Sequence, residues 1–335
     1  MQPFRFAILG AAKIGANFCD AARRAEGVTV AAVASKSMER ARAFAEANGV
    51  EHYYADYAEM LDREKPDCAY VDVTPHDHFR LSMLCLEKGV PVLCEKAMFL
   101  NSADAERFFA AAREKKLFAM EALWSRFQPA LNRAKEWLEA GRIGETVLAE
   151  SALGFQPPMD AENRYFSPRL GGGPSYDVTV YSYETLTYLL GEAETTHAEV
   201  VPAFTGVDGT TIVTLRIGDV PAVLTNSFLT CLDNRLAIYG TRGRIVVPEP
   251  HCNREAFLYN EKGELEEHFV DTATENGFVY EIEEVVRRVR AGEMESPVEP
   301  HRATIACARL FDRILEKLVD GGASSPATAT PSRFC

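Results

Sequence analysis

Apolar runs alternate with helical patterns through the first third of the chain. The apolar runs have the length and composition of buried strands and lie at residues 4–9, 29–34, 52–54, 68–73, 90–94 and 117–123. The stretches between them repeat apolar residues at helical spacing, at residues 13–26, 37–48, 56–63, 77–88 and 102–115. This alternation predicts a doubly wound parallel sheet with helices on both faces, an α/β domain that we place at residues 1–122.

The pattern changes after residue 122. A helical pattern at 126–140 is followed by alternating apolar stretches between turn residues, at 146–155, 211–217, 221–230, 235–240 and 243–249. These stretches predict a C-terminal α+β domain with a mostly antiparallel open sheet, which we place at residues 123–321 and which ends with helical patterns at 280–292 and 301–320. The small and polar residues 322–335 are expected to be a disordered tail.

An open sheet with helices on one face leaves apolar positions exposed on the other. A second copy of the chain would bury those positions, so we expect a homodimer or homotetramer formed through the C-terminal sheet.

Charge and cysteine usage narrow the class of protein. The formal net charge of −13 over 335 residues argues against a nucleic-acid partner, because such binding relies on clustered Lys and Arg. The eight cysteines include no C-x-x-C and no paired Cys/His spacing, so we expect no metal site and no disulfide framework. Without a secretory signal or an apolar run of about 18 residues, the chain is expected to be cytoplasmic with no membrane contact.

A turn rich in small residues follows the first predicted strand. It reads Gly10, Ala11, Ala12, Lys13, Ile14 and Gly15, which keeps the outer glycines of G-x-G-x-x-G and has alanine at the middle one. Backbone N–H groups at the start of the next helix can face a pyrophosphate there. The turn therefore favours a Rossmann dinucleotide-binding domain over the alternative, an ordinary tight turn between strand and helix.

The end of the second strand indicates which dinucleotide binds. NAD-binding proteins usually carry an acidic residue there, whereas this chain has Ser35, Lys36 and, one turn later, Arg40. These residues suit a 2′-phosphate, so we expect NADP, with NAD less favoured. The alternative, that Lys36 and Arg40 are merely solvated, is disfavoured because cations at a helix start oppose its dipole.

Two charges follow the apolar run at 90–94. Glu95 and Lys96 mark the carboxyl end of a strand, which is where open α/β sheets bind ligands. Lys96 is therefore a candidate for contact with both cofactor and substrate. A purely structural ion pair between Glu95 and Lys96 is the alternative.

Five stretches together resemble one known family. They are LGAAKIG at 9–15, VPVLCEKAMFLN at 90–101, MEALWSRFQPA at 120–130, GRIGE at 141–145 and YFSPRLGGGPSYDVTVYS at 165–182. In order and spacing, over nearly the whole chain, they resemble the glucose–fructose oxidoreductase and inositol dehydrogenase family (GFO/IDH/MocA). Within it they are most similar to dimeric dihydrodiol dehydrogenases and NADP-dependent D-xylose dehydrogenases. The resemblance implies an NAD(P)-dependent oxidoreductase that transfers hydride between nicotinamide and a hydroxyl of a sugar, polyol or dihydrodiol.

The resemblance also implies roles for three residues. Lys96 would lie beside the nicotinamide and substrate, with Asp177 and Tyr181 as its partners. On a helix beginning near Asp177, positions 177 and 181 share one face, which agrees with this grouping. Tyr181 is the candidate acid/base, with cationic Lys96 lowering its pKa and Asp177 orienting the hydroxyl or the lysine. A packing role for Tyr181 is the alternative.

Further positions follow from the same resemblance. On the cofactor side they are Thr74, Pro75, His76, Glu95 and Arg126, and in the substrate wall they are Trp124, Phe155 and Arg164. His76 and His78 stand two residues apart with Asp77 between them, but we favour loop packing against the cofactor over a metal site.

The chain departs from the family at one position that bears on activity. The family triplet Glu-Lys-Pro is Glu95-Lys96-Ala97 here, and a cis bond is far less accessible before alanine than before proline. If relatives use a cis bond there, Lys96 is either held in that geometry by its surroundings or displaced. Two alternatives therefore stay open: an NADP(H)-binding regulatory or scaffold protein that has lost the chemistry, and an oxidoreductase that keeps its cofactor bound between two sugars.

Overall fold

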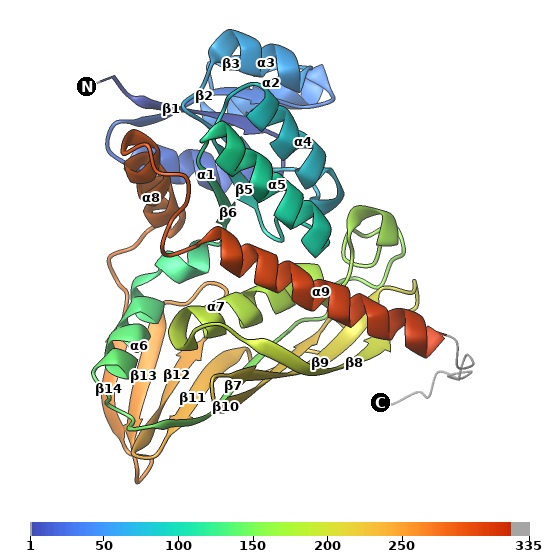
Figure 1. The fold of residues 1–335 in the computed structure, drawn as a ribbon. Coiled ribbons are helices and arrows are strands. Elements are labelled where there is room, and N and C mark those ends of the chain that lie inside the picture. The colour runs from blue at the N-terminus through green and yellow to red at the C-terminus, as the bar shows by residue number, and fades with distance from the viewer. Residues whose placement is uncertain (1, 323–335) are drawn as a thin grey trace.

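The N-terminal half forms a doubly wound parallel sheet, as the sequence predicts. A computed structural model describes residues 2–322. Its first elements are β1 (Phe4–Leu9), α1 (Lys13–Arg24), β2 (Val28–Ala34), α2 (Met38–Asn48), β3 (His52–Tyr54), α3 (Tyr57–Glu64), β4 (Cys68–Val71), α4 (Pro75–Glu87), β5 (Val92–Glu95), α5 (Ser102–Lys115) and β6 (Ala119–Ala122). The six strands pair in the order β3-β2-β1-β4-β5-β6, all parallel (Figure 1).

Local sequence accounts for these elements. The central strands β1, β4 and β5 are buried along nearly their whole length, which explains their continuous apolar runs. Side chains cap three of the helices: Ser37, Asp56 and Asn101 each accept a hydrogen bond from the backbone N–H three residues on. The α1 helix is different, because Ala12 at its N-cap offers no side-chain acceptor.

The C-terminal half contains an eight-stranded, mostly antiparallel sheet. Its elements are α6 (Pro129–Glu139), β7 (Thr146–Gly154), α7 (Val180–Leu190), β8 (Glu194–Pro202), β9 (Asp208–Ile217), β10 (Val220–Ser227), β11 (Arg235–Gly240), β12 (Gly243–Pro248), β13 (Glu255–Asn260), β14 (Leu265–Val270), α8 (Phe278–Arg290) and α9 (His301–Gly322). Among the strand pairs of this sheet, β7 with β10 is parallel and the others are antiparallel. The sequence predicted the inner strands but not β8, β13 and β14.

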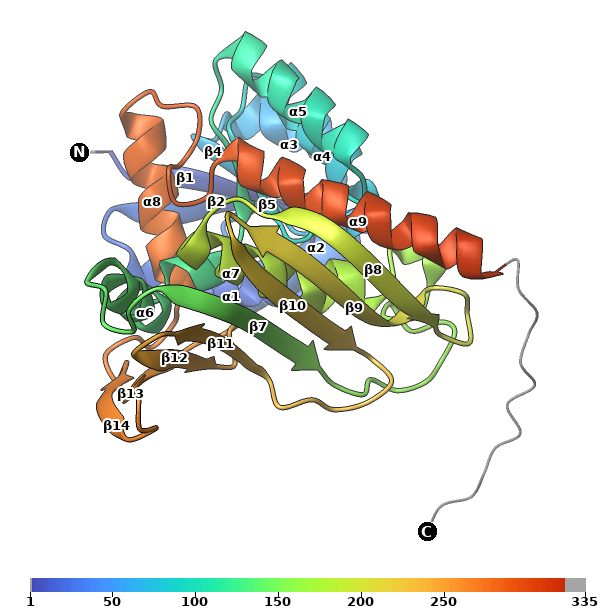
Figure 2. The ribbon, with the colours of Figure 1, turned by 60° about the horizontal axis from the view of Figure 1, so that its bottom comes forward.

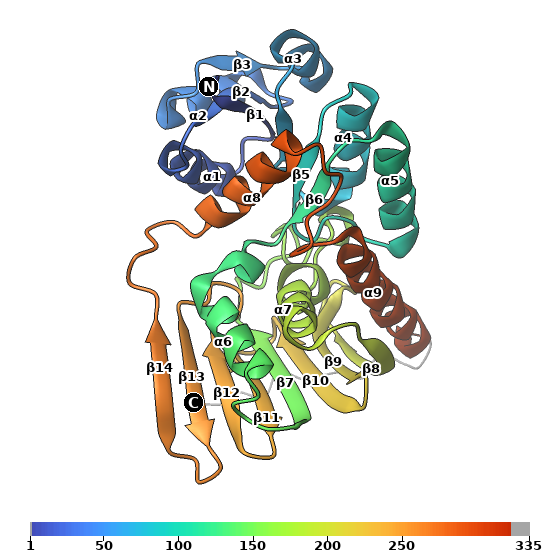
Figure 3. The ribbon, with the colours of Figure 1, turned by 60° about the vertical axis from the view of Figure 1, so that its left-hand side comes forward.

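Two late helices tie the halves together. Helix α8 packs against α1, and its Ile282 and Val285 belong to the same apolar cluster as Phe6 and Phe18 (Figure 3). The segment assigned by sequence to the C-terminal domain therefore returns to the first sheet. Helix α9 lies between α5 and β8 (Figure 1). It extends to Gly322, and the expected disordered tail otherwise falls outside the described residues.

The large sheet keeps one face free of helices within the described chain. Helices α6 and α7 pack on one face, and Figure 2 views the strands from the opposite side. Exposed apolar side chains on its strands are Val147, Leu148, Val201, Ile212, Leu265 and Val270. Among residues 2–322, no helix combines the length and apolar composition that a membrane-spanning segment needs.

Candidate functional site

A cavity of about 980 Å³ lies where the carboxyl ends of the parallel strands meet the second half of the chain. Most of the residues predicted from the sequence line it: Gly10, Ala11, Ala12, Lys13, Ile14, Ser35, Lys36, Arg40, Thr74, Pro75, His76, Glu95, Lys96, Phe155, Arg164, Asp177 and Tyr181. Trp124 and Arg126 are not part of its wall. The structure thus brings the predicted dinucleotide residues and the predicted Lys-Asp-Tyr group into one space.

The glycine turn is packed directly against the end of β4. Gly10 has φ +136°, and a Cβ placed on it would lie 1.7 Å from the backbone oxygen of Asp72. The backbone N–H of Ala12 donates to the Asp72 carboxylate at 3.3 Å. The uncapped first turn of α1 faces the cavity beside this turn, which is the arrangement that binds a pyrophosphate. The residues present therefore fit a dinucleotide.

Asp72 was not predicted from the sequence. Burial raises its pKa well above the ordinary value, and the nearby Glu95 raises it further. Its position at the carboxyl end of a strand could have identified it as a site residue, as the same position identified Glu95.

Two cations, Lys36 and Arg40, follow the end of β2. The Lys36 ammonium pairs with Asp77 at 2.7 Å, and its side chain remains 67% exposed. The Arg40 guanidinium donates to the carbonyl oxygen of Ala11 at 3.4 Å, which places it beside the glycine turn. Both side chains are within the cavity wall, together with Ser35.

The two histidines after β4 have different surroundings. His76 lines the cavity, and its Nδ1 lies 2.9 Å from the Thr74 hydroxyl. His78 is buried, with Nδ1 3.0 Å from the Ala97 carbonyl oxygen and Nε2 2.9 Å from that of Val73. Both ring nitrogens of His78 thus face backbone oxygens, and it supports the segment that follows Lys96.

Lys96 lies in the cavity and contacts both of its predicted partners. Its ammonium donates to the Asp177 carboxylate at 3.0 Å and to the Asp177 carbonyl oxygen at 2.9 Å. The same nitrogen is 4.7 Å from the centre of the Tyr181 ring. The Lys96–Ala97 peptide bond is cis. Because Lys96 lines the cavity and contacts both predicted partners, the alanine that follows it has not displaced it. The buried Tyr70 hydroxyl donates to Glu95, and the carboxylate that forms an ion pair with Lys96 in the described chain is that of Asp177.

The sequence places Asp177 and Tyr181 at the start of one helix. A π-helical turn, Ser175–Thr179, leads directly into α7, and Asp177 lies within that turn. Because both side chains line the same cavity, the predicted common face is confirmed.

The charges of this group follow from burial and its partners. Burial alone would raise the pKa of Asp177, but Lys96 and Arg164 outweigh it, so that pKa lies below its ordinary value. Burial alone would lower the pKa of Lys96, but Asp177, Tyr181 and Glu95 outweigh it in turn. Lys96 is therefore an ammonium and Asp177 a carboxylate at neutral pH.

Tyr181 corrects one part of the sequence reasoning. Burial raises the pKa of Tyr181 to about 12, and the opposing effect of Lys96 only partly offsets this rise. Tyr181 is thus a neutral phenol at neutral pH, whereas the sequence reasoning expected its pKa to be lowered. The Trp124 indole N–H donates to the Tyr181 hydroxyl at 3.2 Å, so Trp124 contacts the site through Tyr181 and not through the cavity wall.

Arg126 is placed differently from the prediction. Its guanidinium is 3% exposed and pairs with Glu184 and, at 3.1 Å, with Glu299. A buried arginine held by two carboxylates has no route to a dinucleotide in the cavity. The expectation that it contacts the cofactor is therefore corrected to a structural role where α7 meets α9.

The part of the cavity wall around Asp177 has aromatic and charged residues. Phe155 meets Tyr165 edge to face, and the Arg164 guanidinium lies over the Tyr165 ring and 3.3 Å from the Asp177 carboxylate. Sequence reasoning missed Asn234, Glu249 and His251, which line the cavity from loops of the large sheet. No strand-end or spacing signal marks these loop residues.

Asp208 anchors the turn that carries Asp177, and it gives a pH-dependent prediction. Its carboxylate accepts from the Ser175 N–H at 2.9 Å and from the Ser175 hydroxyl at 2.7 Å. Burial raises the pKa of Asp208 to about 6. A raised carboxyl pKa means that its protonated form stabilises the fold at low pH, and this contribution is lost as pH rises through about 6.

Asp208→Asn, which carries no charge at any pH, should therefore gain stability relative to the parent protein between pH 4 and pH 7. The expected gain is at most about 3 kcal/mol and levels off above pH 7. Denaturant unfolding at each pH measures it, with the exposed Asp219→Asn as the control. A stability difference between Asp208→Asn and the parent protein that does not change with pH would contradict the raised pKa of Asp208.

Comparison with known proteins identifies the family of this chain. The family model for an oxidoreductase family with an NAD-binding Rossmann fold matches residues 4–122, and the GFO/IDH/MocA C-terminal domain matches residues 131–246. The chain is 31% identical over 295 residues to trans-1,2-dihydrobenzene-1,2-diol dehydrogenase from Mus musculus, covering 86% of this chain and 87% of the relative. The enzyme of the same name from Xenopus laevis is 30% identical over 299 residues, covering 86% and 89%.

Solved structures agree. A 3-ketoreductase from Actinomadura kijaniata, in complex with NADP and TDP-benzene, superposes with a TM-score of 0.84 at 25% identity, covering 94% of this chain and 98% of that one. An aldose–aldose oxidoreductase from Caulobacter crescentus shares the fold, with a TM-score of 0.85 at 21% identity over 96% and 98% of the chains. The chain belongs to the GFO/IDH/MocA family and is an NAD(P)-dependent oxidoreductase.

Proposed function

We propose that the protein uses NADP to transfer a hydride between nicotinamide and a hydroxyl-bearing carbon of a sugar, polyol or cyclic dihydrodiol. The observation that carries this proposal is the contact of Lys96 with both Asp177 and Tyr181 in the cavity that also holds the glycine turn. A protein that only bound dinucleotide would need no buried ammonium, carboxylate and phenol at this point. The cavity residues that would hold the dinucleotide are the turn at 10–14, Ser35, Lys36 and Arg40.

The residues around Lys96 account for the proton in such a reaction. Bound nicotinamide supplies or accepts the hydride. In the reducing direction, the neutral Tyr181 phenol donates its proton to the carbonyl oxygen of the substrate. The Lys96 ammonium and the Trp124 N–H stabilise the phenolate that forms, and Asp177 keeps Lys96 in place. In the oxidising direction the same phenolate takes the proton of the alcohol.

We propose NADP as the cofactor because Lys36 and Arg40 lie at the end of β2, which carries no carboxylate for the ribose hydroxyls. A fluorescence titration should show NADPH binding at least about tenfold more tightly than NADH, since charge-assisted bonds to a phosphate contribute about 1.5 to 3 kcal/mol each. Lys36→Asp should remove most of that difference and leave the NADH affinity within about threefold.

The control is Arg42→Ala in α2, the helix that begins two residues after Lys36, because Arg42 pairs with Glu46 and is outside the cavity wall. Equal affinity for both cofactors in the parent protein would refute the NADP assignment. Failure to bind either would refute the dehydrogenase proposal itself.

Two observations support the proposed substrate class: the aromatic residues of the cavity wall, and the substrates for which the relatives are named. Phe155 and Tyr165 present apolar faces beside the polar Arg164 and Asp177, a combination that suits a ring carrying vicinal hydroxyls. Aldoses and trans-dihydrodiols assayed with NADP, following absorbance of the reduced cofactor, test the proposal. Tight cofactor binding without turnover of any of these aldoses or dihydrodiols would favour the alternative of a binding protein. Cofactor that survives dialysis and exchanges hydride between two sugars would favour a sugar–sugar oxidoreductase.

We also propose that two or more copies associate through the face of the large sheet that no described helix covers. Its exposed apolar residues include Val201 and Ile212. Burying such a face is favourable at about 25 cal/mol per Å². Light scattering on the eluting protein should give at least twice the 37.1 kDa chain mass, and Ile212→Glu should lower it. A monomeric parent protein would exclude this association.

A further inference from the structure

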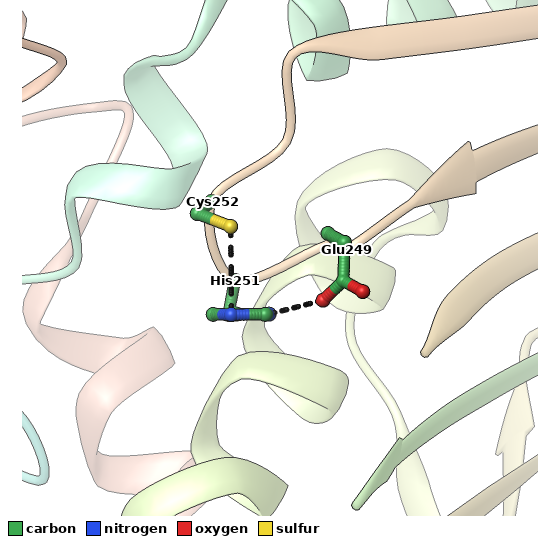
Figure 4. Close-up of side chains that lie close together, drawn as sticks. All are labelled: Glu249, His251 and Cys252. Carbon is green, nitrogen blue, oxygen red and sulfur yellow. Dashed lines mark hydrogen bonds and ion pairs between the residues drawn. The ribbon is translucent and has the colours of Figure 1, made fainter. Parts of the chain in front are cut away.

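Three side chains that the proposed reaction does not use meet in the loop after β12. Glu249, His251 and Cys252 lie close together there (Figure 4). The His251 ring has Nε2 3.4 Å from the Cys252 sulfur and Nδ1 3.5 Å from a Glu249 carboxylate oxygen. Each residue offers one ligand atom, and the three atoms lie within 4.8 Å of one another.

Hydrogen bonds hold the backbone of this loop at both ends. The Glu249 N–H donates to the Asn234 carbonyl oxygen at 2.9 Å, and the Cys252 N–H donates to that of Glu249 at 2.8 Å. Just beyond, the buried Asn253 side chain bonds to the backbone of Leu131, at 2.9 Å, and of Ser125, at 3.2 Å. These contacts fix the backbone positions from which the three side chains extend.

The chemistry of the three ligands matches a borderline cation. Imidazole, thiolate and carboxylate are all ligands of Zn²⁺, whereas Mg²⁺ and Ca²⁺ take oxygen ligands. Zinc–ligand bonds of about 2.0 to 2.3 Å at tetrahedral angles put neighbouring ligand atoms roughly 3.3 to 3.6 Å apart. The His251 ring contacts Cys252 through Nε2 and Glu249 through Nδ1, at 3.4 and 3.5 Å. Because a zinc ion takes one nitrogen of the ring, binding requires the ring to turn so that one nitrogen serves both partners. With one atom taken from each residue, the three ligand atoms lie within 4.8 Å of one another before any such change.

The cluster also has an open side. Glu249 and His251 line the large cavity, and the His251 ring lies 5.9 Å from the Tyr181 ring, centre to centre. Nδ1 of His251 is buried and makes no hydrogen bond within the described chain. An ion held by three protein ligands here would keep its fourth position toward the cavity, the arrangement of an exchangeable zinc site.

We propose that Glu249, His251 and Cys252 form a binding site for Zn²⁺ or a similar ion in the wall of the cavity. This inference goes beyond the proposed hydride transfer and does not depend on it. The sequence predicts no metal site, because it has no C-x-x-C and no paired Cys/His spacing. The adjacent His251 and Cys252 do not fit either pattern, so this proposal revises that prediction. Metal binding would displace the thiol proton of Cys252, whose pKa burial raises in the protein without metal.

Zinc binding to the untagged, chelator-treated full chain tests the proposal. Calorimetry and competition with a chromophoric chelator should give one zinc per chain, and excess Mg²⁺ should not compete. Cys252→Ser and His251→Asn should each weaken binding at least about tenfold. Cys231→Ser is the matched control, because Cys231 is also a loop thiol and lies outside the cluster. No stoichiometric zinc, or equal affinity in all variants, would overturn the proposal.

A second measurement covers the case in which a variant fails to fold. In the parent protein, zinc should slow alkylation of Cys252 by a maleimide at least about tenfold and leave alkylation of the exposed Cys231 unchanged, as read by mass spectrometry of the peptides. Equal alkylation of Cys252 with and without zinc would likewise overturn the site.

Discussion

Tyr181→Phe is expected to lower kcat at least about 100-fold while the affinity for NADPH stays within about twofold. General acid–base groups contribute about 10² to 10⁴ in rate, and the phenylalanine removes only the hydroxyl that would carry the proton. The lost hydroxyl accepts one hydrogen bond, from the Trp124 N–H, and the Lys96 ammonium lies 4.7 Å from the centre of the ring, which phenylalanine keeps. Stopped-flow reduction of a substrate found in the NADP screen gives kcat, and fluorescence titration gives the affinity.

The control for this variant lies two residues away on the same helix. Tyr183 is buried and outside the cavity wall, so Tyr183→Phe should keep kcat within about threefold. A Tyr181→Phe enzyme that retains its full rate would remove Tyr181 from the chemistry and leave it a packing residue.

The pH profile separates the acid from the base role. Because burial raises the pKa of Tyr181 to about 12, the phenol is protonated across the neutral range. Reduction should therefore change little between pH 6 and 9, and oxidation should keep rising on the alkaline side as the phenolate fraction grows. Tyr181→Phe should abolish that alkaline rise, which a merely structural change would not do.

The sequence was most informative where parallel strands end. Gly10, Ser35 and Lys96 are far apart in the chain, but the strands before them, β1, β2 and β5, belong to one parallel sheet and end at the same edge of it. Their meeting in one cavity was therefore predictable from the alternation of strands and helices. Asp72 could have been found by the same argument.

Other features depended on tertiary contacts that no local pattern records. Strands β8 and β14 are largely exposed and rich in Thr and Glu, so they lack the apolar alternation that revealed the inner strands. Arg126 turns away from the cavity because Glu184 and Glu299, distant in sequence, are buried beside it. The raised pKa of Tyr181 comes from its burial, which depends on the elements that pack around α7. The spacing of residues along the sequence does not reveal that packing.

Lys96→Met is expected to reduce kcat at least about 100-fold and to raise the pKa of Tyr181 further, because it removes the cation that favours the phenolate. The variant also leaves Asp177 buried with only Arg164 as an ionic partner, at 3.3 Å. Unpaired buried charges cost about 3 to 5 kcal/mol, and the Arg164 contact should keep the loss below that range. Thermal unfolding and kcat are to be measured on the same preparation.

A second substitution separates the loss of chemistry from the loss of stability. In Lys96→Met/Asp177→Asn the buried carboxylate is gone as well, so the melting temperature should recover toward that of the parent while kcat stays low. Recovery of both would mean that Lys96 serves only to neutralise Asp177. Recovery of the melting temperature without recovery of kcat would assign Lys96 to the reaction. The fold would then be stable without Lys96, whereas the proton transfer would still require it.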